Sequence, residues 1–210
     1  MHDGWRGRKS LLDKTVPYFN VIMRRSAGLV IPRFILPRGF SLSWFVEGDE
    51  ARWADIETSV GEFDDVPAAL KYFQERYVPY LDELKRRLLL VRAANGDWVG
   101  TISAWWNYTG AQRDASIHWL AVRPAYQGLG LGKVLVSECL YTLLRLEGDV
   151  EVFLHTQTWS HRAIGIYFKA GFEIVQRETF GEYQNDYDQA MPVLRRIIPT
   201  EWWPPRRDKG

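Results

Sequence analysis

The sequence predicts an α+β (mixed α/β) fold in a single domain. The length of 210 residues suits one domain with a sizeable core. Segments with strand character dominate the middle of the chain, and helices join them later. Asn95-Gly96 lies between two apolar runs and indicates a β-hairpin. A loop with three glycines then connects a strand pattern, residues 116–122, to a helical one. We therefore expect strands that first pair as a meander and then join helices.

The first half of the chain carries clear signals for two helices and four strands. Apolar residues at helical spacing predict one helix that ends near Gly61. A second helix begins at Asp64 or Asp65, with Pro67 in its first turn. Pro79 should stop or kink this helix. The predicted strands are residues 18–24, 40–46, 88–92 and 98–106.

The second half alternates helices and strands after the glycine loop. The helix that follows the loop spans about residues 130–146 and has Cys139 on its buried side. The later elements are a strand over 150–156, a helix over 160–170, a strand over 172–176 and a last strand over 187–194. We expect a flexible arm over residues 1–15, one domain over 16–198 and a C-terminal tail over 199–210.

Composition excludes several classes of function. The formal charge of +1, from 27 Lys and Arg against 26 Asp and Glu, gives no electrostatic footprint for nucleic acid. A single cysteine excludes an internal disulfide and a cysteine-rich metal site. No pair of His, Asp or Glu has metal-ligand spacing, so we expect no metal. No apolar run approaches a membrane span and no signal peptide is visible, so we expect a cytoplasmic protein without membrane contact.

The glycine-rich loop has the chemistry of a phosphate cradle. Gly128, Gly130 and Gly132 stand between a strand and a helix, where backbone N–H groups and the helix N-terminus favour an anion. The spacing does not match a mononucleotide P-loop, because Gln127 stands where that motif needs glycine. It does not match a dinucleotide fingerprint either, because Lys133 stands where the last glycine belongs. A tight turn without a ligand is the alternative reading.

Two motifs resemble the GCN5-related N-acetyltransferase (GNAT) superfamily. The loop reads Gln-x-x-Gly-x-Gly at residues 127–132, a pattern that binds the pyrophosphate of acetyl-CoA in this family. About thirty residues later, Ala163, Tyr167 and the pair at 171–172 match the family's Asn-x-x-Ala-x-x-x-Tyr-x-x-x-Gly-Phe element in register. Ser160 stands where the family often has asparagine. The clear resemblance covers roughly residues 99–175.

The resemblance implies a fold and a co-substrate. The fold is the GNAT acyl-CoA N-acyltransferase fold, with a central, mostly antiparallel sheet flanked by helices. Acetyl-CoA is the co-substrate, with its pantetheine along the strand before the glycine loop and no metal involved. The residues expected to bind it are Leu120, Ala121, Val122, Gln127, Gly128, Leu129, Gly130, Leu131, Gly132, Lys133, Thr156, Ser160, Ala163 and Tyr167.

Tyr167 is the first candidate for a catalytic residue. It matches the family tyrosine whose hydroxyl lies near the sulfur and acts as general acid. A phenol with a pKa near 10 is protonated at neutral pH and can donate a proton to a leaving thiolate. The alternative is a core tyrosine bonded to a backbone carbonyl.

His118, Glu57 and Glu62 are the candidates for the proton acceptor. His118 lies in the run His-Trp-Leu-Ala-Val, which resembles a run on the acceptor-site strand of some family members. An imidazole near neutrality can relay the proton of an amine. Glu57 and Glu62 flank the junction of the first two helices, which lines the acceptor pocket in the family. The alternatives are a histidine satisfied within the sheet and two solvent-facing helix charges.

These features favour an acetyl-CoA-dependent N-acetyltransferase. The acceptor would be a primary amine of a small molecule or peptide that attacks the thioester directly. A second reading is a non-catalytic CoA-binding sensor or scaffold on the same fold. A third is a nucleic-acid or partner-binding module, disfavoured because its basic residues are split between the two ends of a near-neutral chain. The sequence leaves open whether the chain is a monomer or a homodimer.

Overall fold

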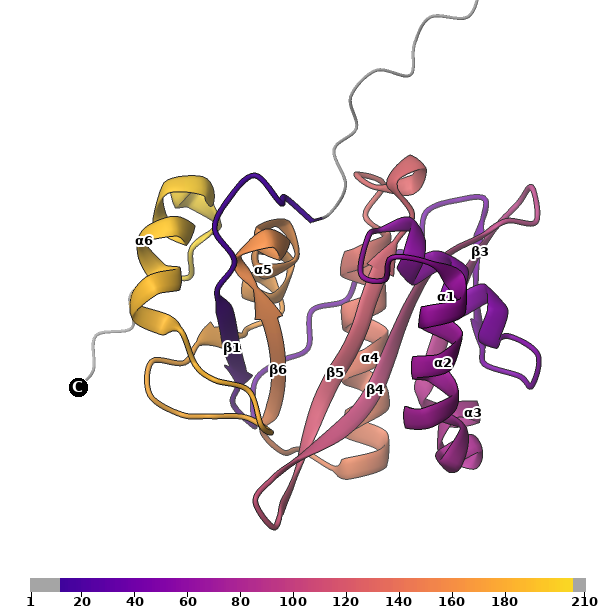
Figure 1. The fold of residues 1–210 in the computed structure, drawn as a ribbon, viewed down its shortest axis with the longest axis horizontal. Helices are drawn as coiled ribbons and strands as arrows, with labels where there is room; N and C mark the ends of the chain where they lie inside the picture. Colours follow the sequence, from indigo (N-terminus) through magenta and orange to yellow (C-terminus); the bar gives the residue numbers. More distant parts are fainter. Residues whose placement is uncertain (1–11, 206–210) are drawn as a thin grey trace, which may run out of the picture.

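A computed structural model of the chain describes residues 12–205, which form one seven-stranded sheet with helices on both faces (Figure 1). The strand order is β2-β3-β4-β5-β6-β1-β7. Every neighbouring pair is antiparallel except β5 and β6. The strands are β1 (Asn20–Arg25), β2 (Phe40–Trp44), β3 (Leu88–Ala93), β4 (Trp98–Thr109), β5 (Gln112–Val122), β6 (Val152–Gln157) and β7 (Glu173–Ile174).

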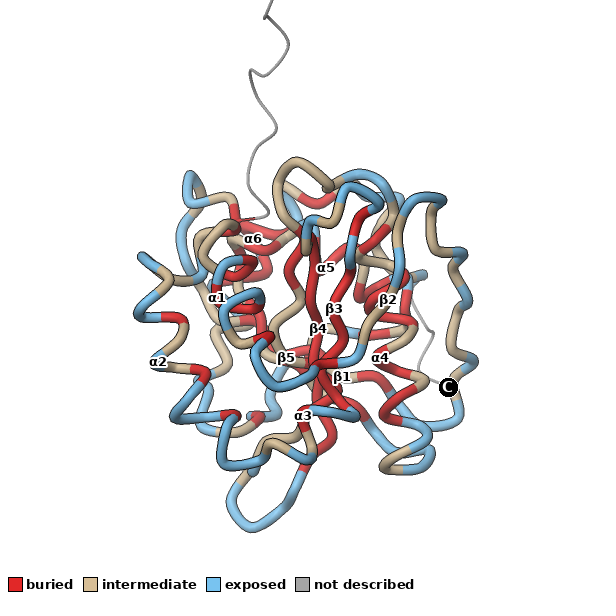
Figure 2. Tube along the Cα trace, turned by 90° about the vertical axis from the view of Figure 1, so that its right-hand side faces the viewer, coloured by how far each residue is buried: buried red, intermediate tan, exposed pale blue. Residues whose placement is uncertain are grey.

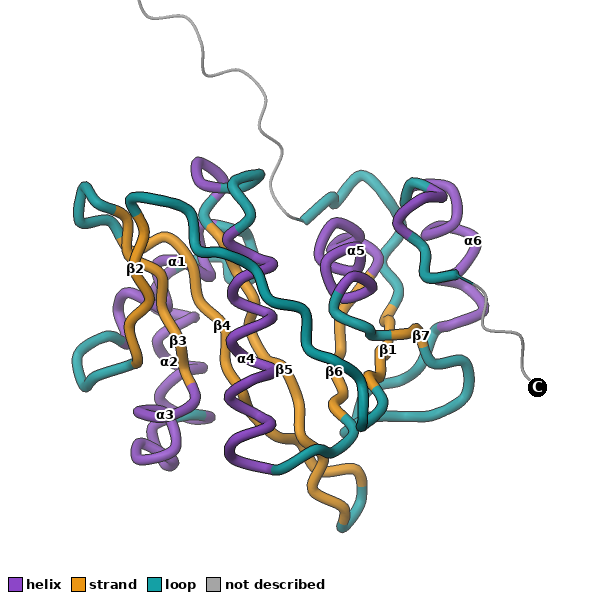
Figure 3. The backbone as a smooth tube through the Cα atoms, turned by 180° about the vertical axis from the view of Figure 1, so that it is seen from behind, coloured by secondary structure: helices purple, strands orange, loops and turns teal. Residues whose placement is uncertain are grey.

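The helices lie in two layers, as the view from behind shows (Figure 3). On one face α1, α2 and α3 cover β3 to β5, and on the other face α4 and α5 lie against the middle of the sheet. Helix α6 packs on β1. The bounds are α1 (Glu50–Ser59), α2 (Val66–Arg76), α3 (Leu81–Arg87), α4 (Leu131–Glu147), α5 (His161–Lys169) and α6 (Tyr187–Ile197).

Each helix layer encloses its own core (Figure 2). The core under α4 and α5 is mostly aliphatic and includes Cys139, which is buried as expected. The core under α1 and α2 is aromatic, with Trp53 at its centre in contact with Phe73 and Tyr77. The central strands are therefore buried on both sides, as their apolar sequences require.

The glycine hairpin and the caps of the first helices form as predicted. Residues 93–97 turn at Asn95-Gly96, and Gly96 has a φ of +94°. The Asp65 side chain accepts a hydrogen bond of 2.8 Å from Ala68 N–H, so Asp65 is the N-cap of α2. Helix α2 ends at Arg76, so it stops before Pro79 as predicted. A 3-10 turn there leads into α3, which the sequence analysis did not anticipate.

The expected meander is wrong for the first strand. β1 does not pair with β2, because residues 26–39 carry the chain across α4 to the other edge of the sheet (Figure 3). The crossing segment is fixed to α4, where Ser137 Oγ donates to Pro32 O at 2.6 Å and Tyr141 OH donates to Ile31 O at 3.1 Å. β1 itself lies between β6 and β7, antiparallel to both.

The predicted last strand over residues 187–194 is also wrong, since this segment is helix α6. Ala190, Met191, Val193 and Leu194 are all buried and lie on one face of the helix. β1 already occupies the position between β6 and β7, and α6 covers β1. Pro192 lies within the helix. The tail also contacts the domain, because Trp202 lies against Gly165 and Trp203 against Phe168.

The predicted arm has two parts. Residues 1–11 lie outside the described residues, as do residues 206–210 of the predicted tail and the basic residues Arg6, Arg8, Lys9, Arg206 and Arg207. Residues 12–15 contact the domain, where Asp13 N–H donates to Trp159 O at 2.8 Å.

β5 and β6 separate after a short parallel contact, and this creates the space for a site. They pair only at Ala115 with Val152 and at Ser116 with Phe153. Further along, β5 contains a bulge, because Thr101 pairs with Ala121 while Ser103 pairs with His118. Trp119, within the bulge, has a φ of +52°. The bulge bends β5 away from β6 and interrupts its hydrogen bonding to β4.

Candidate active site

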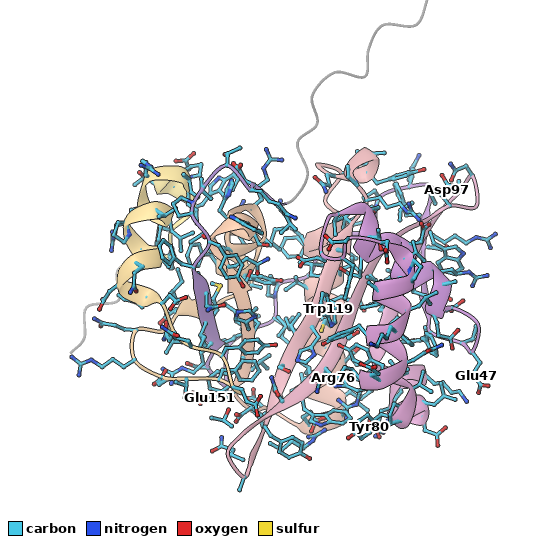
Figure 4. The ribbon with its side chains drawn as sticks, in the orientation of Figure 1. Glu47, Arg76, Tyr80, Asp97, Trp119 and Glu151 are labelled. Carbon is cyan, nitrogen blue, oxygen red and sulfur yellow. The ribbon has the colours of Figure 1, made fainter. Side chains whose placement is uncertain are left out.

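A cavity of about 420 Å³ opens where β5 and β6 separate. Figure 4 shows Trp119 on β5, beside the helices that close this side of the cavity. β5 and β6 provide the side walls. The other lining residues come from α5, from α2 and the junction of α1 and α2, from the N-terminal segment and from the loop after β7. The predicted site residues that line the cavity are Glu57, Glu62, His118, Leu120, Thr156, Ser160, Ala163 and Tyr167.

The glycine loop follows β5 and leads into α4, and none of its residues is among those that line the cavity. Gly128 and Gly130 have φ values of +82° and +90°, and a Cβ at either position would meet nothing within 4 Å. Both positions thus need glycine for their backbone conformation and leave open space in front of the chain. The N–H groups of Lys133 and Val134 donate to Gly130 O at 3.1 and 3.3 Å, and those of Leu131 and Gly132 precede the first intrahelical bond. Open space and unpaired N–H groups at a helix N-terminus fit a pyrophosphate.

The other loop residues have structural tasks that the motif alone did not reveal. A Cβ on Gly132 would lie 2.9 Å from Ile166 Cδ1, so this glycine allows α4 to approach α5. Gln127 Nε2 donates to Val122 O at 2.8 Å and fixes the loop to β5. Leu131 is buried in the core, and the Lys133 ammonium lies 5.9 Å from the Phe34 ring centroid. Ala121 and Val122 bury their side chains, so only their main chain can reach a ligand.

Tyr167 belongs to the cap of α5, which explains the spacing of its motif. Phe172 N–H donates to Tyr167 O at 3.0 Å, and Gly171 provides the required positive φ of +89°. Phe172 is then fully buried against the Tyr167 ring. This cap directs the Tyr167 side chain into the cavity wall. Burial raises the pKa of the phenol, so the hydroxyl stays protonated.

Glu57 is buried, and Glu62 is an exposed residue in the turn after α1 whose side chain lines the cavity. Glu57 is 1% exposed, and neither of its carboxyl oxygens has a hydrogen-bond partner among the described residues. Burial, with the nearby Glu62 charge, holds the pKa of Glu57 well above its usual range. Burial also raises the pKa of Glu62. A hydrogen bond with Gln157 and the positive charge of Lys14 lower this pKa and so partly oppose the effect of burial. The cavity therefore contains two neighbouring carboxyl groups that resist simultaneous ionisation.

His118 is half-buried in the cavity wall, and its imidazole is neutral. Burial lowers its pKa to about 4, with a smaller effect of His155. Its Nδ1 lies 3.2 Å from the Tyr77 hydroxyl, a hydrogen-bond distance. A histidine with this pKa holds no proton at neutral pH, and its affinity for a proton is low.

Several aromatic residues of the cavity were not anticipated. Tyr183, from the loop after β7, stacks on His155 with ring centroids 3.7 Å apart. Tyr72 of α2 and Trp119 of β5 contact edge to face at 5.2 Å. Tyr18 and Lys14 reach the cavity from the N-terminal segment. Tyr77 could not be recognised from its position on an apolar helix face, because its role depends on a contact 41 residues away in sequence.

Within residues 12–205, no group of three or more His, Cys, Asp and Glu side chains is arranged to hold a metal ion. None of the helices described has the length and apolar character needed to cross a membrane.

Comparison with known proteins agrees with this architecture. Residues 52–172 match the model of the acetyltransferase (GNAT) family. A GCN5-related N-acetyltransferase from Sphaerobacter thermophilus superposes with a TM-score of 0.55 at 24% identity, over 74% of this chain and 48% of that one. A GNAT-family acetyltransferase from Colwellia psychrerythraea gives 0.53 at 11% identity, over 76% and 55%. No curated protein sequence matches the chain.

A tandem GNAT protein from the clavulanic acid biosynthesis pathway also superposes, with a TM-score of 0.53 at 18% identity, over 78% of this chain and 52% of that one. The chain thus spans about half the length of these three structures, and at such identities they are evidence for the fold alone. The family match covers more than half of the chain, and the splayed strands, glycine loop and capped tyrosine helix agree with it. This chain belongs to the GNAT acetyltransferase family.

Proposed function

We propose that this chain transfers the acetyl group of acetyl-CoA to a primary amine of a small molecule or peptide, by direct attack on the thioester. The observation that carries the proposal is the composition of the cavity. Tyr167, with a protonated hydroxyl, and Glu57, with an unpartnered carboxyl, line the same space between β5 and β6. A proton donor and a proton acceptor are what acyl transfer to an amine requires.

The acyl donor would bind along β5 with its pyrophosphate at Gly128 and Gly130. Beyond Ser116 the main chain of β5 no longer pairs with β6, so the segment near Leu120 and Val122 can bond the pantetheine along that edge. A backbone N–H there would polarise the thioester carbonyl as negative charge develops on its oxygen. The side chains of Thr156, Ser160 and Ala163 would line the same channel.

A carboxylate suits the proton-acceptor role better than His118. At neutral pH an alkylamine is mostly protonated and cannot attack a carbonyl. The proton passes to ionised Glu57 or Glu62, whose raised pKa makes either a stronger base than an ordinary carboxylate. His118, with a pKa of about 4, is a weaker base and acts as a neutral hydrogen-bond partner. This reverses the order expected from the sequence.

The remaining steps balance the reaction. The neutral amine nitrogen forms a bond to the thioester carbon, and the carbon–sulfur bond breaks. Tyr167 gives its proton to the departing thiolate, and the nitrogen loses its extra proton, which restores the phenol directly or through water. The carboxyl group then releases its own proton to solvent. Holding amine and thioester in one small cavity supplies much of the acceleration.

Thiol release from acetyl-CoA, measured with a panel of primary amines, tests the proposal. Amine-dependent release by the wild-type chain, reduced in Tyr167→Phe, is the expected result. Calorimetric binding of acetyl-CoA without release with any amine would favour the non-catalytic sensor. If the chain neither binds acetyl-CoA nor releases its thiol with any amine, the proposal is wrong.

A further inference from the structure

The ammonium group of Lys14 occupies a cation site at the mouth of the cavity. Its Nζ donates to Gly61 O at 3.3 Å and lies 5.3 Å from the centroid of the Trp159 ring. It is close enough to Glu62 for its charge to lower the pKa of that carboxyl. A carbonyl oxygen, an aromatic face and a carboxylate together are the surroundings that proteins use to bind ammonium ions.

Lys14 is held there by an N-terminal strap, which we define as residues 12–17. The strap is fixed to the start of α5 by two hydrogen bonds of 2.8 Å, from Asp13 N–H to Trp159 O and from Trp159 Nε1 to Val16 O. It passes above α5 in Figure 1. The Lys14 side chain then reaches across to Gly61, on the opposite side of the cavity mouth. Lys14 is exposed, so its side chain can leave without disturbing the core.

The interior of the cavity holds a second carboxyl with no cation beside it. Glu57 is 1% exposed, and both of its oxygens lack a partner among the described residues. Leaving a buried polar group unpartnered is costly unless a ligand completes it. The walls contain aromatic rings of Tyr18, Tyr72 and Tyr183, which suit an alkyl chain carrying positive charge.

We propose that the preferred acceptor is an alkyl diamine, whose reacting amine lies at Glu57 and whose second ammonium replaces Lys14 Nζ between Glu62, Gly61 O and the Trp159 ring. This rests on the proposed acetyl transfer. One dication satisfies both carboxyls of the cavity. A monoamine satisfies one and leaves the other to Lys14. The strap lysine is then a tethered competitor for the outer position.

The test compares kcat/KM for 1,4-diaminobutane and 1,5-diaminopentane with values for butylamine and pentylamine. The diamines are expected to be better by about tenfold, because a second cation gains a carboxylate and an aromatic face. Equal values for diamines and monoamines would overturn the diamine assignment and leave acetyl transfer intact. If no amine is acetylated while acetyl-CoA is bound, the proposed function itself fails.

Variants of the strap and the outer carboxyl locate the second ammonium. Lys14→Ala removes the competitor and should lower KM for the diamines several-fold, raising the diamine-to-monoamine ratio of kcat/KM. Lys14→Arg keeps the charge and should retain the wild-type ratio. Glu62→Gln should reduce the ratio about tenfold. Lys71→Ala, an exposed lysine of α2 paired with Glu75, is the matched control. If Glu62→Gln leaves the diamine-to-monoamine ratio of kcat/KM unchanged, the second ammonium does not bind at Glu62.

Discussion

Burial sets the protonation state of three ionisable groups in the cavity, those of Tyr167, His118 and Glu57. It keeps the phenol of Tyr167 protonated and the imidazole of His118 neutral, and it raises the pKa of Glu57. The residue types alone do not show which of these groups is the better base at neutral pH. His118 looked like the better base because the ordinary pKa of histidine is near neutrality. Desolvation in the cavity wall lowers the pKa of His118 to about 4 and reverses that order.

Tyr167→Phe keeps the ring that packs on Phe172 and removes only the proton donor. The turnover number should fall ~10²–10⁴-fold, the usual contribution of general acid catalysis. The affinity for acetyl-CoA should change little. Steady-state kinetics together with calorimetry measure both quantities. A variant with wild-type turnover would assign Tyr167 to packing.

The pH profile identifies the proton acceptor. A carboxylate base is active when ionised, so kcat/KM should rise with pH through an apparent pKa above the usual glutamate range, as burial of Glu57 and Glu62 requires. Glu57→Gln should abolish this rise of kcat/KM with pH or shift its apparent pKa. A His118 base would place this rising limb of the profile near pH 4 instead.

The ionisation of the acceptor can imitate such a limb, so the profile must be repeated with an amine of different pKa. A limb that follows the amine and survives Glu57→Gln, Glu62→Gln and His118→Gln would show that no protein base is needed.

At the scale of elements, the site depends on three local devices. These are the β5 bulge at Trp119, the glycine loop before α4 and the glycine cap of α5 at Gly171. The sequence revealed the glycine loop, because glycine readily adopts such backbone conformations. Gly171 was recognised only as part of the family motif, and its role as a cap comes from the structure. The sequence did not reveal the bulge, since a bulge at a tryptophan has no sequence signal. The strand predicted over residues 187–194 was wrong because the four buried apolar residues of α6 are also compatible with a strand. Only the position of β1 in the sheet excludes that alternative.

Gly130→Asp tests the loop as an anion site. The substitution adds a side chain and a negative charge in front of the N-terminus of α4, so calorimetry should show a loss of acetyl-CoA affinity of at least about tenfold. Gly110→Asp is the matched control. Gly110 also has a positive φ, +61°, and open space around its Cβ position, but lies in the hairpin between β4 and β5. Unchanged affinity in Gly130→Asp would exclude this loop as the phosphate site.

At the scale of the whole molecule, the sheet is completed by the N-terminal strand. The order β6-β1-β7 joins residues more than 125 positions apart in sequence, and short-range patterns carry no information about such pairings. The family resemblance correctly predicted a central, mostly antiparallel sheet flanked by helices, but it did not include the separation of β5 from β6. The strap and the aromatic cavity lining depend on where β1 enters the sheet, so they could be recognised only in the structure.

The two desolvated histidines should make the fold sensitive to acid. The pKa values of His118 and His155 are lowered to about 4, while in the unfolded chain they lie near 6.5. The free energy of unfolding should therefore be unaffected by these two groups above pH 6.5. It should fall as the pH drops toward 4, by on the order of 3 kcal/mol for each histidine. Urea unfolding at several pH values should show that His118→Gln loses less stability on acidification than the wild type. Equal losses would mean that desolvation does not hold His118 in the neutral form.

Mass spectrometry of an amine incubated with acetyl-CoA and the chain tests the central claim most directly. The account predicts that 1,4-diaminobutane gains one acetyl group on nitrogen at a rate proportional to the amount of wild-type chain. Tyr167→Phe should retain only a small fraction of that rate. If no member of a broad amine panel gains an acetyl group while the chain is folded and binds acetyl-CoA, the chain is not an N-acetyltransferase.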